Sequence, residues 1–308
     1  MGAATPPLLD GRSYLTDGGL ETDLIFNHGI DLPEFAAFPL VEDESGRETL
    51  AAYYAAYADL ARKAGAGLVL ESPTWRANPD WAAKVGYDAA ALDRANREAV
   101  RFLHQERDGY DDLSDVLISG QIGPRGDGYV AGEKADPDEA AAYHKPQIES
   151  FAAAGADLTQ ALTMTGPEEA IGIVRAARSV GLPVGISFTV ETDGRLPDGT
   201  RLADAVAQVE ADGGPDHYLL NCAHPEHVLP GLADENGGGW RERIVGFRPN
   251  ASKRTHQELD EAEDLDAGDP AELSSSFEQL RARLPSVSLL GGCCGTDARH
   301  VAALWGLA

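Results

Sequence analysis

The nine residues AGAGLVLES (64–72) contain the end of a helix, a turn and a buried strand. The segment before them has apolar residues at helical spacing, and Gly65 stands where a glycine commonly ends a helix. The run that follows is short, apolar and continuous, which is typical of a parallel strand covered on both faces. The same turn returns in AGADLTQALTM (154–164), so the sequence repeats a helix–turn–strand unit.

Units of this kind fill the chain from one end to the other. Strands are predicted at 14–19, 67–72, 116–121, 157–164, 183–190, 217–223, 243–250 and 287–294. Helical periodicity is clearest at 47–65, 88–106, 136–155 and 166–181. Eight alternating pairs favour a closed (β/α)8 TIM barrel over an open doubly wound sheet. No linker or low-complexity segment divides the sequence, so residues 1–308 are predicted to form a single domain.

The composition excludes some classes of partner. The formal net charge is −26, from 51 acidic and 25 basic residues, so nucleic acids and anionic membranes would be repelled. The surplus is expected to form a solvated acidic surface, and a saline habitat could be the reason for it. No run is long and apolar enough to span a membrane, and the first residues do not resemble a signal peptide. A cytoplasmic location is therefore expected, and a homo-oligomer is left open.

In a barrel of this kind the catalytic residues lie where the strands end. The polar and reactive residues expected at those ends are Asp17, Glu71, Thr74, Gln121, Thr163, Glu191, Cys222, Asn250, Cys293 and Cys294. This set contains all three cysteines of the sequence, two of them adjacent. We therefore expect the three thiols to converge at one end of the barrel.

Three thiolates with an open fourth position are the ligands of a tetrahedral zinc site that admits a further ligand. Glycines around the pair, in GGCCGT (291–296), would let both adjacent side chains face one ion. Another interpretation makes Cys222 an ordinary buried residue and the pair incidental. A rival ligand set would use His224 or His217.

Several motifs together resemble one protein family. NCAHP (221–225) with GGCCGT (291–296) is similar to the zinc-binding signature of the homocysteine S-methyltransferase family. LTDGGLETDL (15–24) resembles the opening strand and turn of that family, and ESPTWRANPDWAAKVGY (71–87) resembles its second-strand block. SGQIGPRGDGY (119–129) resembles the third-strand block, and RPNAS (248–252) the seventh. The resemblance covers essentially the whole chain in order.

The resemblance implies a methyltransferase whose Zn²⁺ is bound by Cys222, Cys293 and Cys294. The thiol of homocysteine would take the fourth position, which favours its deprotonated form. A methyl group would then move from an onium-type or other activated donor to that thiol, giving methionine. Both substrates are small molecules, and betaine, S-methylmethionine, S-adenosylmethionine and methylated folates remain open as donors.

The resemblance also implies substrate contacts. Asp17 matches the acidic residue that holds the amino group of the substrate, although a DGG sequence is also an ordinary turn with a capping aspartate. Thr74 and Trp75 match positions that line the pocket, and the Trp75 ring could face an onium cation or simply pack. Asn250 would orient a loop or a ligand carboxylate, and structural capping is an equal alternative.

One position departs from the family pattern. Leu162 stands before Thr163 where the family carries a glutamate that also binds the homocysteine amine. Either another carboxylate compensates, or the acceptor is a different thiol. Glu191 is the first candidate for compensation and Glu71 the second.

Two further functions are weighed against the methyltransferase. The first is a hydrolase that activates a metal-bound water, which a set of three thiolates disfavours because of its negative charge. The second is a non-catalytic zinc or thiol-redox protein in which Cys293 and Cys294 form a vicinal disulfide.

Overall fold

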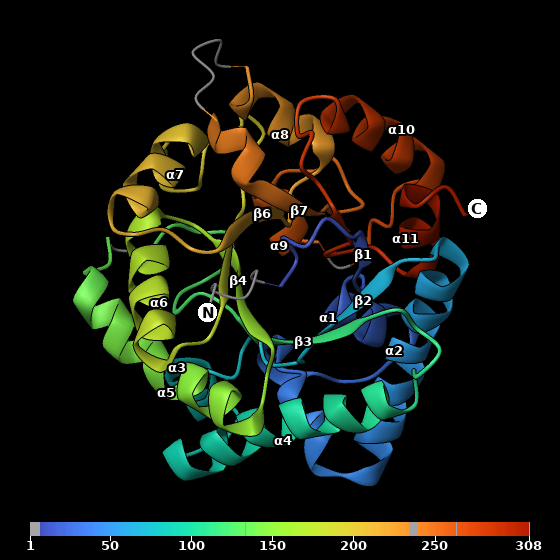
Figure 1. Cartoon of the computed structure of the whole chain (residues 1–308), viewed down its shortest axis with the longest axis vertical. Helices are drawn as coiled ribbons and strands as arrows, with labels where there is room; N and C mark the ends of the chain where they lie inside the picture. Colours follow the sequence, from blue (N-terminus) through green and yellow to red (C-terminus); the bar gives the residue numbers. More distant parts are fainter. Residues whose placement is uncertain (1–6, 133, 234–238, 263, 308) are drawn as a thin grey trace.

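Eight parallel strands close into a barrel in which each strand pairs with its neighbours in the sequence and β1 pairs with β8 (Figure 1). The computed structural model describes residues 7–132, 134–233, 239–262 and 264–307. The strands are β1 (Tyr14–Leu15), β2 (Gly67–Glu71), β3 (Val116–Ile122), β4 (Leu158–Met164), β5 (Val184–Phe188), β6 (His217–Asn221), β7 (Ile244–Arg248) and β8 (Leu289–Leu290). The predicted single-domain (β/α)8 barrel is confirmed.

Helices surround the barrel (Figure 1). They are α1 (Leu20–Thr22), α2 (Glu44–Ala64), α3 (Pro79–Lys84), α4 (Ala89–Asp108), α5 (Pro137–Ala154), α6 (Pro167–Val180), α7 (Leu202–Ala211), α8 (Pro225–Gly231), α9 (His256–Asp260), α10 (Pro270–Arg281) and α11 (Ala298–Leu304). The four helices that the sequence predicted most clearly are confirmed as α2, α4, α5 and α6. Gly65 ends α2 with φ +63°, as its position in the sequence indicated.

The ends of the helices explain part of the acidic surplus. The side chains of five aspartates accept hydrogen bonds from backbone N–H groups at helix starts: Asp43, Asp88, Asp136, Asp269 and Asp297. Such caps satisfy donors that the helix itself leaves unpaired, and the negative charge suits the positive end of the helix dipole. These five of the 51 acidic residues therefore serve the local structure of their helices.

The core requires small residues where helices approach strands. A Cβ on Gly120, in β3, would lie 2.3 Å from the ring of Phe151 on α5. That ring is fully buried, so β3 and α5 pack closely because residue 120 has no side chain.

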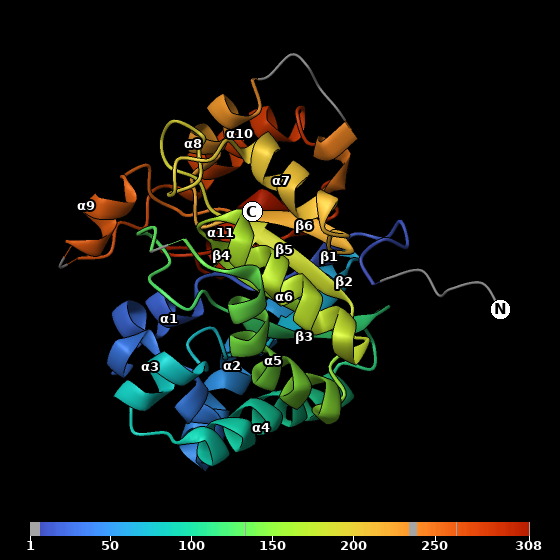
Figure 2. The ribbon, with the colours of Figure 1, turned by 90° about the vertical axis from the view of Figure 1, so that its left-hand side faces the viewer.

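Strands β1 and β8 are two residues long, shorter than predicted. The DGG and GGCC segments that follow them leave the sheet and turn over the carboxyl ends of the strands. In the side view, α1, α3 and α9 project on this same side of the barrel (Figure 2).

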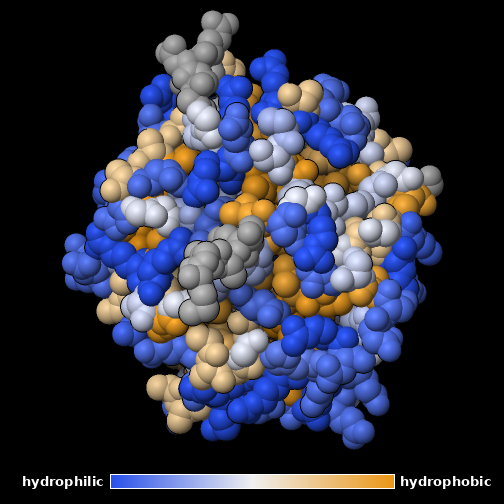
Figure 3. All heavy atoms as spheres, viewed as in Figure 1, coloured by the Kyte–Doolittle hydropathy of each residue, from blue (hydrophilic) through white to orange (hydrophobic). Residues whose placement is uncertain are grey.

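On the face shown in Figure 3, hydrophilic residues dominate the periphery and hydrophobic ones gather near the middle. Within the part of the chain that the structure describes, no helix is long and apolar enough to cross a membrane.

Candidate metal and substrate site

The three cysteines meet above the carboxyl ends of β6 and β8. Cys222 directly follows β6, and Cys293 and Cys294 lie in the turn after β8. Their Sγ atoms all lie within 4.8 Å of one another. The predicted convergence of the three thiols is therefore present.

The structure joins Cys222 and Cys293 as a disulfide and leaves Cys294 as a thiol. The vicinal Cys293–Cys294 disulfide weighed from the sequence is not the one that forms. The Cα atoms of Cys222 and Cys293 are 5.4 Å apart, a separation typical of disulfides, so the fold itself brings these two residues together.

The backbone around the cysteines has a left-handed residue at Cys222 and a tight turn at Gly292. Cys222 has φ +54°, a left-handed conformation that non-glycine residues seldom adopt and that is often found at functional sites. In the turn after β8, a Cβ on Gly292 would lie 2.1 Å from Oγ1 of Thr296. A glycine is required there for the turn to fold back over the barrel.

One pair of sulfurs, one of them in the disulfide, already has the spacing that a tetrahedral metal ion requires. Zinc–sulfur bonds of about 2.3 Å at tetrahedral angles place two sulfurs about 3.8 Å apart. Sγ of Cys222 and Sγ of Cys294 are separated by 3.8 Å. Within the described residues, no other group of three His, Cys, Asp or Glu side chains has this convergence.

The rival histidine ligands lie elsewhere. Nδ1 of His224 accepts a hydrogen bond from the backbone N–H of Glu226 at the start of α8. His217 begins β6, at the opposite end of that strand from Cys222, and packs against Gly185. Neither histidine belongs to the cysteine cluster.

A cavity of about 420 Å³ lies over the sulfurs. Among its lining residues are Asp17, Glu21, Phe35, Trp75, Arg76, Trp81, Asp127, Tyr129, Leu162, Thr163, Asn221, Cys222, Arg248, Cys293 and Cys294. Of the residues predicted from the sequence, these therefore share one cavity: the three cysteines, Asp17, Trp75, Gln121, Leu162 and Thr163.

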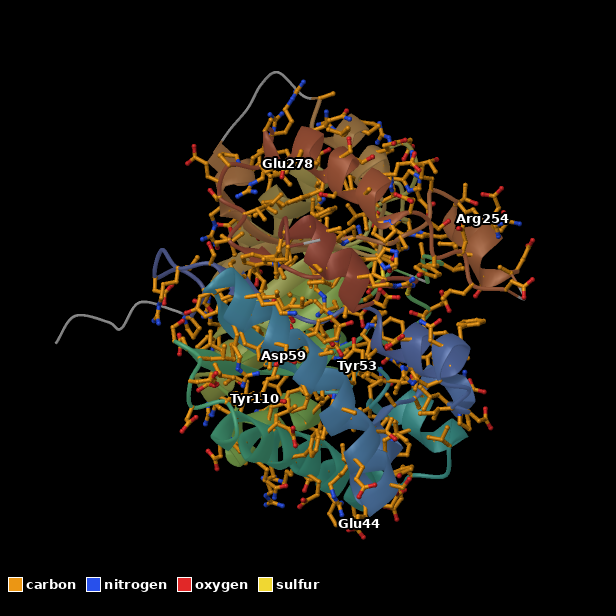
Figure 4. The ribbon with its side chains drawn as sticks, turned by 90° about the vertical axis from the view of Figure 1, so that its right-hand side faces the viewer. Glu44, Tyr53, Asp59, Tyr110, Arg254 and Glu278 are labelled. Carbon is orange, nitrogen blue, oxygen red and sulfur yellow. A yellow bond between two sulfur atoms is a disulfide. The ribbon has the colours of Figure 1, made fainter. Side chains whose placement is uncertain are left out.

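Asp17 is paired with a buried arginine. The guanidinium of Arg248, on β7, contacts the Asp17 carboxylate at 2.5 Å and Glu71 at 3.6 Å. Burial raises the pKa of the Asp17 carboxyl, and Arg248 opposes that shift. Tyr53, labelled on α2 in Figure 4, donates its hydroxyl to the same carboxylate at 3.3 Å.

Glu71 and Glu191, the two predicted replacements for the missing glutamate, do not reach the cavity. Oε1 of Glu71 accepts a hydrogen bond from Gln160 at 2.7 Å inside the barrel, beside Arg248. Glu191 lies 2.9 Å from Nδ1 of His256, whose Nε2 lies 2.8 Å from the carbonyl oxygen of Cys222. Glu191 therefore supports the backbone of Cys222 through His256 and does not contact the substrate cavity.

Thr74 and Asn250 also lie outside the cavity lining, and their side chains donate hydrogen bonds to backbone carbonyl groups. Thr74 donates its hydroxyl to the carbonyl of Gln121 at 2.7 Å, and Asn250 donates to the carbonyl of Cys222 at 3.0 Å. Of the functions expected for Asn250, orienting a loop or capping the structure fits this hydrogen bond, and binding a ligand carboxylate does not.

Trp75 lines the cavity beside the guanidinium group of Arg76. The guanidinium of Arg76 lies 4.1 Å from the Trp75 ring centre and 3.5 Å from that of Trp81. Nε1 of Trp75 donates to the carbonyl of Leu162 at 3.4 Å. The stacking with Arg76 orders this wall of the cavity.

Two residues that the sequence did not single out contact the sulfurs. The hydroxyl of Tyr129 donates to Sγ of Cys294 at 3.1 Å, and burial raises the Tyr129 pKa well above its ordinary value, so the hydroxyl keeps its proton. The Asn221 amide lies 3.7 Å from Sγ of Cys293. Burial also raises the pKa of the Cys294 thiol to about 11, which disfavours the thiolate unless a cation binds.

Known proteins share this fold and sequence pattern. A family model described as homocysteine S-methyltransferase matches residues 14–306. The homocysteine S-methyltransferase of Escherichia coli is 27% identical, with 96% of each chain covered. The homocysteine S-methyltransferase YbgG of Bacillus subtilis is 25% identical over 60% of this chain and 59% of its own.

Solved structures agree in architecture. The oxidised form of the homocysteine methyltransferase MmuM from Escherichia coli superimposes with a TM-score of 0.77 at 25% identity, covering 98% of each chain. The metallated form of MmuM has the same fold, with a TM-score of 0.75 at 24% identity and 97% coverage of each chain. Because the family model spans nearly the whole sequence, this chain is a methyltransferase that belongs to the homocysteine S-methyltransferase family.

Proposed function

We propose that this chain is a zinc-dependent enzyme that transfers a methyl group from an onium-type or other activated donor to the thiol of homocysteine, producing methionine. The observation that carries the proposal is the convergence of Cys222, Cys293 and Cys294 beneath a cavity of about 420 Å³. That cavity is large enough for small-molecule substrates.

The three thiolates would hold zinc, which favours the deprotonated and therefore nucleophilic form of an acceptor thiol. The acceptor thiol releases its proton to solvent, and its sulfur forms the bond to the methyl carbon. The bond between that carbon and the donor breaks, and its electron pair stays on the donor. The cavity walls would align the two substrates for this displacement.

The side chains around the sulfurs have the charge that these substrates require. Tyr129 donates a hydrogen bond to Cys294, which stabilises negative charge on that sulfur. Acidic side chains outnumber basic ones in the lining, which favours a cationic donor. Phe35 and Trp75 add aromatic surface beside which an onium methyl group can lie.

The test is replacement of each cysteine by serine in reduced, zinc-supplemented protein. Cys222→Ser, Cys293→Ser and Cys294→Ser should each lose most of the zinc and all methyl transfer to homocysteine, with circular dichroism unchanged. Folding should survive because the barrel core lies below the metal site. Zinc is measured by atomic absorption, and methionine is measured against a panel of methyl donors.

His224→Gln is the matched control, because His224 is the nearest rival ligand in the sequence and caps a helix instead. It should keep full zinc and activity. Full zinc in Cys222→Ser would contradict the three-cysteine ligand set. Zinc binding with no methyl transfer to homocysteine from any donor would contradict the proposed reaction.

A further inference from the structure

The acidic residues in the cavity lining differ in how their charge is compensated. Six of them line it: Asp17, Glu21, Asp31, Glu34, Asp127 and Asp260. Asp17 pairs with Arg248, Glu34 with Lys84 at 3.4 Å, and Asp127 lies 3.9 Å from Arg76. Asp31 and Asp260 are exposed and therefore hydrated.

Glu21 is the exception. It is only partly exposed, and its carboxylate lies within ion-pair distance of no basic side chain in the described part of the chain, although Arg248 and Arg76 attract its charge from farther away. Both arginines of the lining are engaged by other partners, Arg248 by Asp17 and Glu71 and Arg76 by Asp127 and the carbonyl of Gly126. A sheltered carboxylate without a partner is costly, and a bound cation would remove that cost.

The position of Glu21 brings this carboxylate close to the reacting atoms. Glu21 lies in α1, four residues after Asp17, where the chain leaves β1 and turns over the cavity. Glu21 lines the same cavity as Cys222, Cys293 and Cys294, and burial together with the charge of Asp17 raises the pKa of Glu21 to about 7. A small ligand can therefore reach both the sulfurs and Glu21.

Other carboxylates do not fulfil this function. Leu162, which lines the same cavity, brings no charge, while Glu71 and Glu191 are directed to Arg248 and His256. The chemistry of the cation also matters. An ammonium donates hydrogen bonds to a carboxylate, whereas a fully alkylated onium has no N–H and is better matched by aromatic faces.

We infer that Glu21 binds the α-ammonium group of the acceptor amino acid while the acceptor thiol lies at Cys222, Cys293 and Cys294. This rests on the proposed methyl transfer to an amino-acid thiol and assigns the residue that distinguishes that acceptor from simpler thiols. Glu21 thereby takes the place of the carboxylate that is absent at Leu162.

The test compares homocysteine with 4-mercaptobutanoate, which has the same thiol, chain and carboxylate but no amine. Both are assayed with reduced, zinc-loaded wild type and Glu21→Gln. Loss of a charged hydrogen bond should raise KM for homocysteine about 10- to 100-fold, while KM for 4-mercaptobutanoate changes less than about threefold. Zinc content should stay as in the wild type, and KM for the donor should change less than about threefold, because the other acidic residues of the lining remain.

Glu34→Gln is the matched control, because it removes the same charge from an exposed position at the same cavity. It should leave both acceptor KM values within about twofold, since exposed pairs contribute little. Glu21→Asp keeps the charge on a shorter side chain and should give an intermediate KM for homocysteine. It serves as the decisive variant if Glu21→Gln does not fold.

Equal changes in KM for the two acceptors would overturn the assignment of Glu21. A rise in KM for the donor alone would also overturn it, by placing the onium group at Glu21. In both cases the wild type still methylates homocysteine, so the proposed function stands. A wild type that methylates 4-mercaptobutanoate but not homocysteine would instead overturn the acceptor in the proposed function and the inference with it.

Discussion

At the scale of single residues, Arg248 balances the buried charge beneath the site. It is 3% exposed, and it contacts Asp17, Glu71 and the carbonyl of Gly292 in the turn that carries two cysteines. Removing one partner from a buried ion pair leaves the other charge uncompensated. The resulting loss of stability is larger than the net stabilisation that the intact pair provides.

Arg248→Met should lower the free energy of unfolding by about 3–5 kcal/mol near pH 8. Burial raises the pKa of Glu71 from 4.5 to about 7 even with Arg248 present, and removal of Arg248 raises it further. Glu71 then keeps its proton to higher pH in the folded state than in the unfolded state. The free energy of unfolding therefore falls as pH rises from the unfolded pKa of Glu71 to its folded pKa. The loss should therefore be smaller at pH 5.5 than at pH 8, as measured by urea unfolding.

Arg175→Met is the control, since Arg175 pairs with Asp138 and Asp212 at an exposed position. It should cost no more than about 1 kcal/mol at either pH. An equal and small loss in both variants would show that Arg248 does not compensate buried charge.

The sequence predicted the cysteines more reliably than the carboxylates. Each cysteine follows an apolar strand, and parallel strands of a barrel end on one side, so convergence followed from topology. Glu191 also follows a strand, but its loop directs the side chain to His256. Glu21 lies in a segment whose sequence resembles the start of an ordinary helix. Only the packed structure shows that it lines the cavity.

At the scale of elements, the ends of β4 and β6 are held in unusual conformations by one side chain. Thr163 and Cys222 have φ of +65° and +54°, and the register between β4 and β5 shifts between Ala161 and Met164. Asn221 accepts hydrogen bonds from the Thr163 N–H at 2.8 Å and from the Ser187 hydroxyl at 2.6 Å. Its amide also donates to the Thr163 hydroxyl at 2.8 Å, so it links β4, β5 and β6.

Asn221→Ala should lower the free energy of unfolding by about 2–4 kcal/mol, because it leaves buried donors on two neighbouring strands without acceptors. It should also weaken zinc binding about 10- to 100-fold, since the Asn221 amide lies beside Cys293 and the adjacent Cys222 loses its support. Urea unfolding of metal-free protein and competition with a zinc chelator measure the two effects separately.

Ser187→Ala removes only one of these hydrogen bonds and serves as the control. It should cost about 1 kcal/mol and leave zinc affinity unchanged. If Asn221→Ala matched it in both measurements, the bonds to Thr163 and Cys293 would contribute nothing. The order of the strands was predictable from their apolar runs, but this irregular backbone was not, because it depends on contacts between strands far apart in sequence.

At the scale of the whole molecule, charge opposes compactness. Acidic residues exceed basic ones by 26, so even complete pairing of every lysine and arginine would leave a large negative excess. Some of these carboxylates cap helices, where the local charge is favourable, but at longer range they repel one another. Salt weakens the exposed ion pairs as well, yet these contribute little individually, so repulsion should dominate the response.

Added salt should therefore stabilise the protein. Raising NaCl from about 0.01 to 0.1 M shortens the screening length from about 30 to 10 Å, so the melting temperature should increase over this range and then level off. A gain of about 1 kcal/mol would raise it by about 1.5 °C for a chain of 308 residues. Sodium sulfate at equal ionic strength should give the same increase at low concentration, because screening depends on ionic strength. A melting temperature that stays constant or falls would mean that the exposed ion pairs, rather than the net charge, control the stability of the barrel.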